Sequence, residues 1–141
     1  MAAPRPLRGV RVLDLSPVVA GPFATMSLSD LGAEVIKVER IDGGDDSRGM
    51  GPQLAGWGAM FVPLNRGKRS IAINVTQPAG REAVLKLASG RDVYVENFPG
   101  GKAVQPGLAV ASARPPPAAL TPPTNSAPRP PAPASPPAAI D

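Results

Sequence analysis

The chain has 141 residues, including 20 prolines and 15 glycines, and carries 15 basic and 11 acidic side chains. It contains no cysteine and no histidine, which excludes disulfides, thiolate nucleophiles, imidazole bases and the common zinc sites. The net charge is only +4, and aromatic residues make up 4% of the chain. A nucleic-acid binder needs a concentrated basic surface or stacking side chains, so we expect no nucleic-acid partner, and we expect no metal.

No apolar run approaches the roughly 18 residues that cross a bilayer, and the N-terminus lacks the apolar segment of a secretory signal. We therefore expect a soluble, cytoplasmic protein without membrane association. Arg5, Arg8 and Arg11 precede the first acid, Asp14, which leaves a mitochondrial location open. Residues 10–15, however, are better explained as a buried strand than as part of a cleaved presequence.

Composition divides the chain in two. Residues 109–141 contain 11 prolines and 10 alanines among 33 residues, whereas residues 1–108 have a nearly ordinary globular mixture. A segment this poor in large apolar side chains cannot bury enough surface to fold. We predict a partial globular domain over residues 1–108 and a disordered Pro/Ala-rich tail over residues 109–141.

The N-terminal part predicts a strand, a helix and a second strand. Residues 10–15 (VRVLDL) and 34–39 (EVIKVE) are short and rich in β-branched residues. Between them, Pro22 suits a first helical turn and Gly32 suits a left-handed cap. The predicted apolar face of the helix consists of Ala20, Phe23, Ala24, Leu28 and Leu31. This βαβ unit should have parallel strands.

The next residues, 41–57, contain five glycines and several aspartates, which predicts a long loop. A helical turn at 60–64, a strand at 70–74, a helix at 78–89 and a strand at 92–96 follow in the pattern. The fold class is therefore predicted to be α/β, with an open, mostly parallel, Rossmann-like sheet.

Three segments together resemble the N-terminal part of the class III CoA-transferases, the CaiB/BaiF family. They are VAGPFATMSLSDLGAEVIKVER at 19–40, NRGKRSIAINV at 65–75 and RDVYVENF at 91–98, in that order and spacing. The resemblance covers about residues 7–108. The family includes formyl-CoA and succinyl-CoA:dicarboxylate transferases, and α-methylacyl-CoA racemase is a relative. It implies acyl-CoA and a carboxylic acid as substrates, and a homodimer for full-length members.

The resemblance also implies a binding site for the CoA nucleotide. Coenzyme A brings phosphates, which call for fixed cations and backbone N–H donors, and ligands of open α/β sheets bind beyond the carboxyl ends of the strands. Three such ends, at Ser16, Arg40 and Asn97, should converge. The residues implied by the family are Val19, Ala20, Arg40, Ile73, Asn74, Val75, Thr76, Asn97 and Phe98.

Other polar residues have simpler interpretations. Lys68 and Arg69 read as solvated charge in a loop, with a phosphate role left open. Asp45 and Asp46 read as turn formers, and we assign them no catalysis. Glu39 ends a strand as the ribose-binding acid of a dinucleotide fold does, but the first turn lacks the Gly-x-Gly-x-x-Gly spacing, so NAD binding is a minor alternative.

The resemblance implies covalent catalysis, in which an Asp carboxylate attacks the acyl-CoA to give a mixed anhydride. The only acid after Glu96 is Asp141, which matches no family motif. We therefore expect a truncated or frame-altered family member without the nucleophile, and no catalytic residue is assigned. The alternatives are a racemase-like fragment, a non-catalytic CoA-binding protein, and a proline-rich interaction protein that acts through its tail.

Overall fold

The computed structural model describes residues 5–97, and the predicted tail, the boundary at residue 108 and Phe98 lie outside them. Four strands form one sheet in the order β5-β2-β1-β6, and every neighbouring pair is parallel. The strands are β1 (Arg11–Asp14), β2 (Glu34–Glu39), β5 (Arg69–Ala72) and β6 (Val93–Val95). The predicted open α/β fold with a parallel sheet is confirmed.

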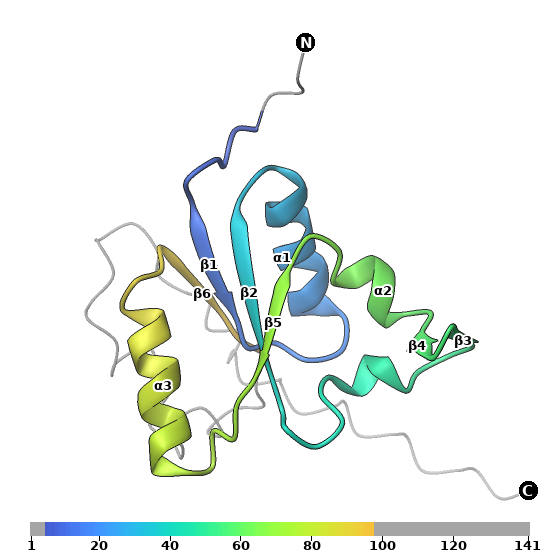
Figure 1. Ribbon diagram of the computed structural model, residues 1–141. Helices are drawn as coiled ribbons and strands as arrows, with labels where there is room; N and C mark the ends of the chain where they lie inside the picture. The colour runs from blue at the N-terminus through green and yellow to red at the C-terminus, as the bar shows by residue number, and fades with distance from the viewer. Residues whose placement is uncertain (1–4, 98–141) are drawn as a thin grey trace, which may run out of the picture.

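Two helices of eleven residues cover opposite faces of this sheet (Figure 1). The first, α1 (Ala20–Asp30), links β1 to β2, and the second, α3 (Pro78–Ala88), links β5 to β6. Gly32 has a φ of +105° just after α1, as the cap prediction required. Because α1 follows β1 and α3 follows β5, each helix begins at the edge of the sheet where its preceding strand ends.

The segment predicted as a continuous loop has local structure. It contains the 3₁₀ helix η1 (Asp46–Arg48) and a small antiparallel hairpin of β3 (Gln53–Leu54) and β4 (Trp57–Gly58). The predicted helical turn follows as α2 (Phe61–Leu64). These short elements form a lobe beside α1 and the sheet (Figure 1). None of the helices within residues 5–97 has the length and apolar character that crossing a membrane requires.

The predicted apolar face of α1 is wrong except at Leu28, which is partly buried and packs against the cluster of Val12, Ala33 and Val35. Phe23 is 56% exposed and Leu31 46% exposed, and the residues of α1 that are buried are Gly21, Pro22, Thr25 and Met26. The reason is a close polar contact with β1 and its following loop. The Thr25 hydroxyl donates to Asp14 at 2.6 Å, and a Cβ on Gly21 would lie only 2.0 Å from the Ser16 hydroxyl oxygen. Next to β1, small and polar residues such as Gly21 and Thr25 therefore take buried positions, while Met26 and, in part, Leu28 are the buried larger apolar residues of α1.

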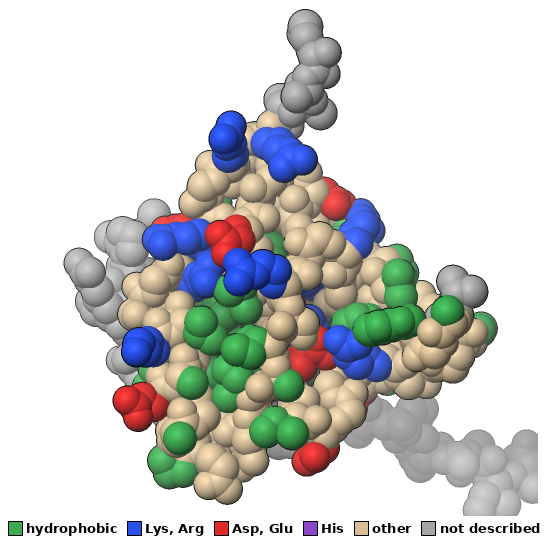
Figure 2. All heavy atoms as spheres, viewed as in Figure 1, with side chains coloured by type: hydrophobic (Ala, Val, Ile, Leu, Met, Phe, Trp, Pro, Cys, Tyr) green, Lys and Arg blue, Asp and Glu red, His purple; other side chains and the backbone are tan. Residues whose placement is uncertain are grey.

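The two faces of the sheet have different interiors. On the α3 side, Leu13, Leu15, Ile36 and Val38 pack with Val84 of α3 in an apolar cluster. Figure 2 shows hydrophobic side chains gathered on this side, between α3 and β5. On the α1 side a smaller cluster contains Val12, Ala33 and Val35, and alternate residues further along β1 and β2 are charged. The strands thus separate an apolar layer from a partly ionic one.

Candidate functional site

The sheet has a topological switch point beside β1. From β1 the chain passes to β2 on one side, and it later returns to place β6 on the other side. Because all four strands are parallel, their carboxyl ends meet at one edge, the lower edge in Figure 1. Ligands of open α/β sheets bind at such an edge, next to the switch point. The β1–α1 loop and Asn97 lie there.

At this edge Asn97 contacts the β1–α1 loop, which leads to Val19 and Ala20. Asn97 Nδ2 donates to the Pro17 carbonyl at 3.3 Å, which connects the end of β6 to the β1–α1 loop. Val19 is the N-cap of α1 and makes no side-chain cap bond, and both Val19 and Ala20 are exposed. Val19 and Ala20, where α1 begins, are therefore open to solvent, whereas Gly21 and Pro22 are buried.

Arg40 follows β2 at the same edge. Its side chain is 63% exposed, and its guanidinium donates from Nε to the Gly44 carbonyl at 3.1 Å and pairs with Asp46. The guanidinium is therefore held by the loop after β2 and remains accessible to solvent. An accessible guanidinium is suited to binding a phosphate, and a phosphate would compete with the exposed Asp46 carboxylate for the same N–H donors.

The predicted residues after β5 have mainly structural contacts. The Ile73 N–H donates to the Glu39 carbonyl at 2.9 Å, which places it beside Arg40, and Ile73 and Val75 pack against the apolar cluster on the α3 side. Asn74 Oδ1 accepts from the Thr76 N–H at 3.0 Å and from its hydroxyl at 2.6 Å. This turn leads into α3.

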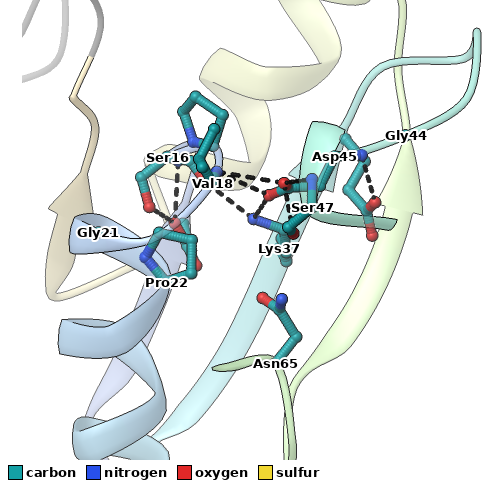
Figure 3. A network of polar contacts seen from close by, with 12 residues as sticks. Ser16, Val18, Gly21, Pro22, Lys37, Gly44, Asp45, Ser47 and Asn65 are labelled. Carbon is teal, nitrogen blue, oxygen red and sulfur yellow. Dashed lines mark hydrogen bonds and ion pairs between the residues drawn. The ribbon is translucent and has the colours of Figure 1, made fainter. Parts of the chain in front are cut away.

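Beneath these loops lies a network of buried charges that the sequence interpretation did not single out (Figure 3). Lys37 Nζ lies 2.8 Å from Asp45 Oδ2, and the two side chains are 2% and 1% exposed. Lys37 also donates to the Ser16 carbonyl at 2.7 Å, and the Val18 N–H donates to Asp45 Oδ1 at 3.1 Å. Asp45 caps η1 by accepting from Ser47, so it is a turn former as predicted and also half of a buried ion pair.

A second buried pair joins Lys68 to Asp14. The Lys68 nitrogen lies 3.0 Å from Asp14 Oδ2 and also donates to the Pro22 carbonyl at 3.0 Å and to Asn65 Oδ1 at 2.9 Å. Its side chain is 1% exposed, so the interpretation of Lys68 as solvated charge is wrong. Lys68 directly precedes β5, and this position places its ammonium beside α1, where it neutralises the buried Asp14 carboxylate. Arg69 is 74% exposed and pairs with Glu34, in agreement with its interpretation.

Glu39 forms the third pair of the network. Its carboxylate accepts two hydrogen bonds of 2.7 Å from Arg48, one of 2.5 Å from the Ser70 hydroxyl and one of 3.0 Å from the Asp45 N–H. The Arg48 guanidinium in turn lies 3.7 Å from the centre of the Phe61 ring. With its oxygens engaged in this way, Glu39 is poorly placed to bind a ribose, which disfavours the NAD alternative.

The surroundings of the three acids keep them ionised. Burial alone would raise the pKa of Asp14, but the Lys37 charge and the Ser16 and Thr25 hydroxyls lower it below its ordinary value. Burial likewise opposes the shift of Glu39, whose pKa the Arg48 and Ser70 hydrogen bonds lower to about 2. The Lys37 and Ser47 hydrogen bonds lower the pKa of Asp45 in spite of its burial.

The alternation of charged and apolar residues along the strands is the sequence signal that could have predicted this network. Lys37 and Glu39 alternate with Ile36 and Val38, so they share the face of β2 that Val35 occupies. Asp14 is paired with Lys37 in the register of β1 and β2 and is equally buried. Opposite charges on one face of two central strands predict a buried ion-pair layer, because buried charges need partners.

Comparison with known proteins identifies the family. The model of CoA-transferase family III matches residues 7–115, which is most of the chain and extends past the boundary expected at residue 108. The chain belongs to CoA-transferase family III. It is 53% identical over 105 residues to mouse succinyl-CoA:glutarate CoA-transferase and 44% identical over 100 residues to succinate–glutarate CoA-transferase of Agrobacterium fabrum. The recognition made from the three segments is thereby confirmed.

Solved structures support the same assignment. A CaiB/BaiF family protein from Brucella suis superposes with a TM-score of 0.72 at 42% identity, covering 78% of this chain and 30% of that one. The mouse relative is matched over 74% of this chain but only 24% of its own length. The chain therefore spans about a quarter of the length of the curated relatives that it matches.

Proposed function

We propose that this chain forms the CoA-nucleotide side of a CoA-transferase site, in a protein that moves CoA between an acyl-CoA and a carboxylic acid. The observation that carries the proposal is the 53% identity to a succinyl-CoA:glutarate CoA-transferase over the segment that supplies the predicted site residues. Dicarboxylic acids and their CoA thioesters are accordingly the substrate class that we infer. The complete enzyme would act as a homodimer, as the family resemblance implies.

In this proposal the carboxyl edge of the sheet receives the phosphates of CoA. Arg40 exchanges its Asp46 partner for a phosphate oxygen, which its accessible guanidinium can reach without unfolding the loop. The exposed start of α1 offers the backbone N–H groups of Val19 and Ala20 and the positive end of the helix dipole. Val19, Ala20, the turn of residues 73–76 and Asn97 would line the nucleotide.

We assign no catalytic residue in the described part of the chain. A nucleophilic carboxylate must be free to attack the thioester carbonyl of the acyl-CoA. Asp14, Glu39 and Asp45 are each buried and held by a cation and by hydroxyl or backbone donors. Their lowered pKa values reflect these partners rather than a reactive position. A non-catalytic CoA-binding protein and a racemase-like relative both remain compatible with this arrangement.

Calorimetric titration of the purified chain with CoA tests the proposal. We expect binding by the wild type and at least a tenfold weaker affinity for Arg40→Ala, because a charge-assisted contact to phosphate is lost. Arg11→Ala is the matched control, since Arg11 also pairs with one aspartate at the surface but lies at the opposite edge of the sheet. Circular dichroism establishes that each variant is folded.

The proposed site would be wrong if a folded wild type bound no CoA, or if both arginine variants weakened binding equally. Turnover is a separate question. Incubation with succinyl-CoA and glutarate, followed by chromatography of the thioesters, distinguishes a transferase from a protein that only binds CoA.

A further inference from the structure

The loop between β1 and α1 contains a strained residue. Val18 has a φ of +69°, in the left-handed region that β-branched residues strongly avoid. Such a conformation persists only where neighbouring contacts hold it, and it often marks a functional segment. Val18 directly precedes Val19 and Ala20, two residues of the proposed site.

Two buried side chains from other segments hold this loop. Asp45 accepts from the Val18 N–H at 3.1 Å and 3.3 Å through its two oxygens, and Lys37 donates to the Ser16 carbonyl at 2.7 Å. Asp45 and Lys37 also pair with each other at 2.8 Å. Figure 3 shows both side chains pointing at the loop, one from β2 and the other from the start of η1. One ionic pair therefore holds both the strained residue itself and Ser16, two positions before it.

We propose that Lys37 and Asp45 are positioning residues of the acyl-CoA site. By holding Val18 in its left-handed conformation, they set the backbone of Val19 and Ala20 at the start of α1, where the ligand phosphates would lie. The inference rests on the function proposed above. It adds residues that contact no ligand and act through the loop.

The chemistry of the pair favours a positioning role over a purely stabilising one. A buried ion pair loses solvation on both sides and adds little net stability compared with apolar side chains of the same size. An ion pair instead fixes the orientation of its groups, because both partners must point their polar atoms at one another and at their remaining hydrogen-bond partners. Here those remaining partners are the Ser16 carbonyl and the Val18 N–H.

CoA titration of Asp45→Asn in the full chain tests this role. Asparagine retains one oxygen but loses the charge that pairs with Lys37, so we expect the affinity of the folded protein to fall about tenfold. Ser70→Ala is the matched control, because it removes one donor to the Glu39 carboxylate in the same network, and Ser70 makes no hydrogen bond to Asp45 or to the β1–α1 loop. We expect Ser70→Ala to lower the denaturation midpoint while leaving the affinity within twofold of wild type.

Rescue by glycine separates positioning from general stability. Glycine adopts positive φ without strain, so adding Val18→Gly to Asp45→Asn should restore most of the lost affinity. Amide NMR provides a readout that does not need CoA: Asp45→Asn should shift the Val18, Val19 and Ala20 resonances, and Val18→Gly should return those of Val19 and Ala20 toward wild type. If Asp45→Asn does not fold, Ser47→Ala, which removes one donor to Asp45, should give smaller changes of the same kind.

The role would be refuted by a folded Asp45→Asn variant with unchanged affinity, by failure of the glycine to restore it, or by unshifted loop amides. A folded wild type that binds no CoA overturns the proposed function instead. The amide measurements then still decide whether the pair holds the loop.

Discussion

Leu13 and Asp14 are neighbours in β1 and are both fully buried, but they face opposite layers of the molecule. Leu13 belongs to the apolar cluster beneath α3. Asp14 faces α1, where it accepts from Thr25 and pairs with Lys68. The same alternation continues in β2, where Ile36 and Lys37 point to different sides.

The difference separates two tasks. The apolar contacts on the α3 side are not directional, because dispersion and the hydrophobic effect require only dense packing. The α1 side is directional, since each buried charge must meet a partner at hydrogen-bond distance. Its partners at the carboxyl edge include the Ser16 carbonyl of the β1–α1 loop and the Pro22 carbonyl in the first turn of α1. One layer thus stabilises the sheet, and the other fixes the loops around the proposed site.

Breaking the ionic layer should have the largest effect. Asp14→Ala leaves the Lys68 ammonium buried without its carboxylate, and removing one partner of a buried pair costs about 3 to 5 kcal/mol. We expect the midpoint of urea denaturation to fall accordingly. The control Asp30→Ala removes a half-exposed partner of Arg66 and should cost less than about 1 kcal/mol. Equal losses for the two variants would contradict the assignment of Asp14 to a buried pair.

A cavity on the opposite side sharpens the comparison. Leu13→Ala removes a fully buried side chain from the α3 layer and should cost about 2 to 4 kcal/mol in the same denaturation experiment. Ile73 and Val75 of the proposed site pack against the same cluster, but Leu13 supplies no polar group to the site, so the folded fraction should bind CoA with close to wild-type affinity. A Leu13→Ala protein that is folded but binds CoA more weakly would show that the two layers are not independent.

Much of the architecture could be predicted because local patterns and tertiary structure agree. The span of β2 matches the predicted residues 34–39, since a run of β-branched residues between two loops has no good alternative. Gly32 ends α1 as expected because its positive φ suits glycine. The site residues were inferred from the resemblance together with the rule that parallel strands end at one edge, and their role in binding CoA stays a prediction.

The missed features depend on contacts between distant segments. Lys68 is 54 residues from Asp14 in the chain, and nothing near it in sequence indicates that its ammonium is buried. The orientation of α1 was missed for the same reason, because Thr25 is turned inward by Asp14 rather than by its own hydrophobicity. Local periodicity finds apolar faces, but it cannot find a polar face that is buried by pairing.

Acid should weaken the ionic layer selectively. The pKa of Glu39 is lowered from 4.5 to about 2 in the folded protein, so on acidification the unfolded chain binds this proton first. Its contribution is present above about pH 4.5 and is lost as the pH falls toward 2, which removes up to about 3 kcal/mol. Urea midpoints measured from pH 7 down to pH 2.5 should therefore fall steeply below pH 4.5.

Glu39→Gln separates this contribution from those of the other acids. The variant should begin with lower stability at pH 7, because Arg48 loses its charged partner, and should then lose less stability on acidification than the wild type. The remaining pH dependence belongs to Asp14 and Asp45, whose pKa values are also lowered. Parallel pH profiles for wild type and Glu39→Gln would mean that Glu39 titrates normally, and that the Arg48 pair does not hold the carboxylate in its charged form.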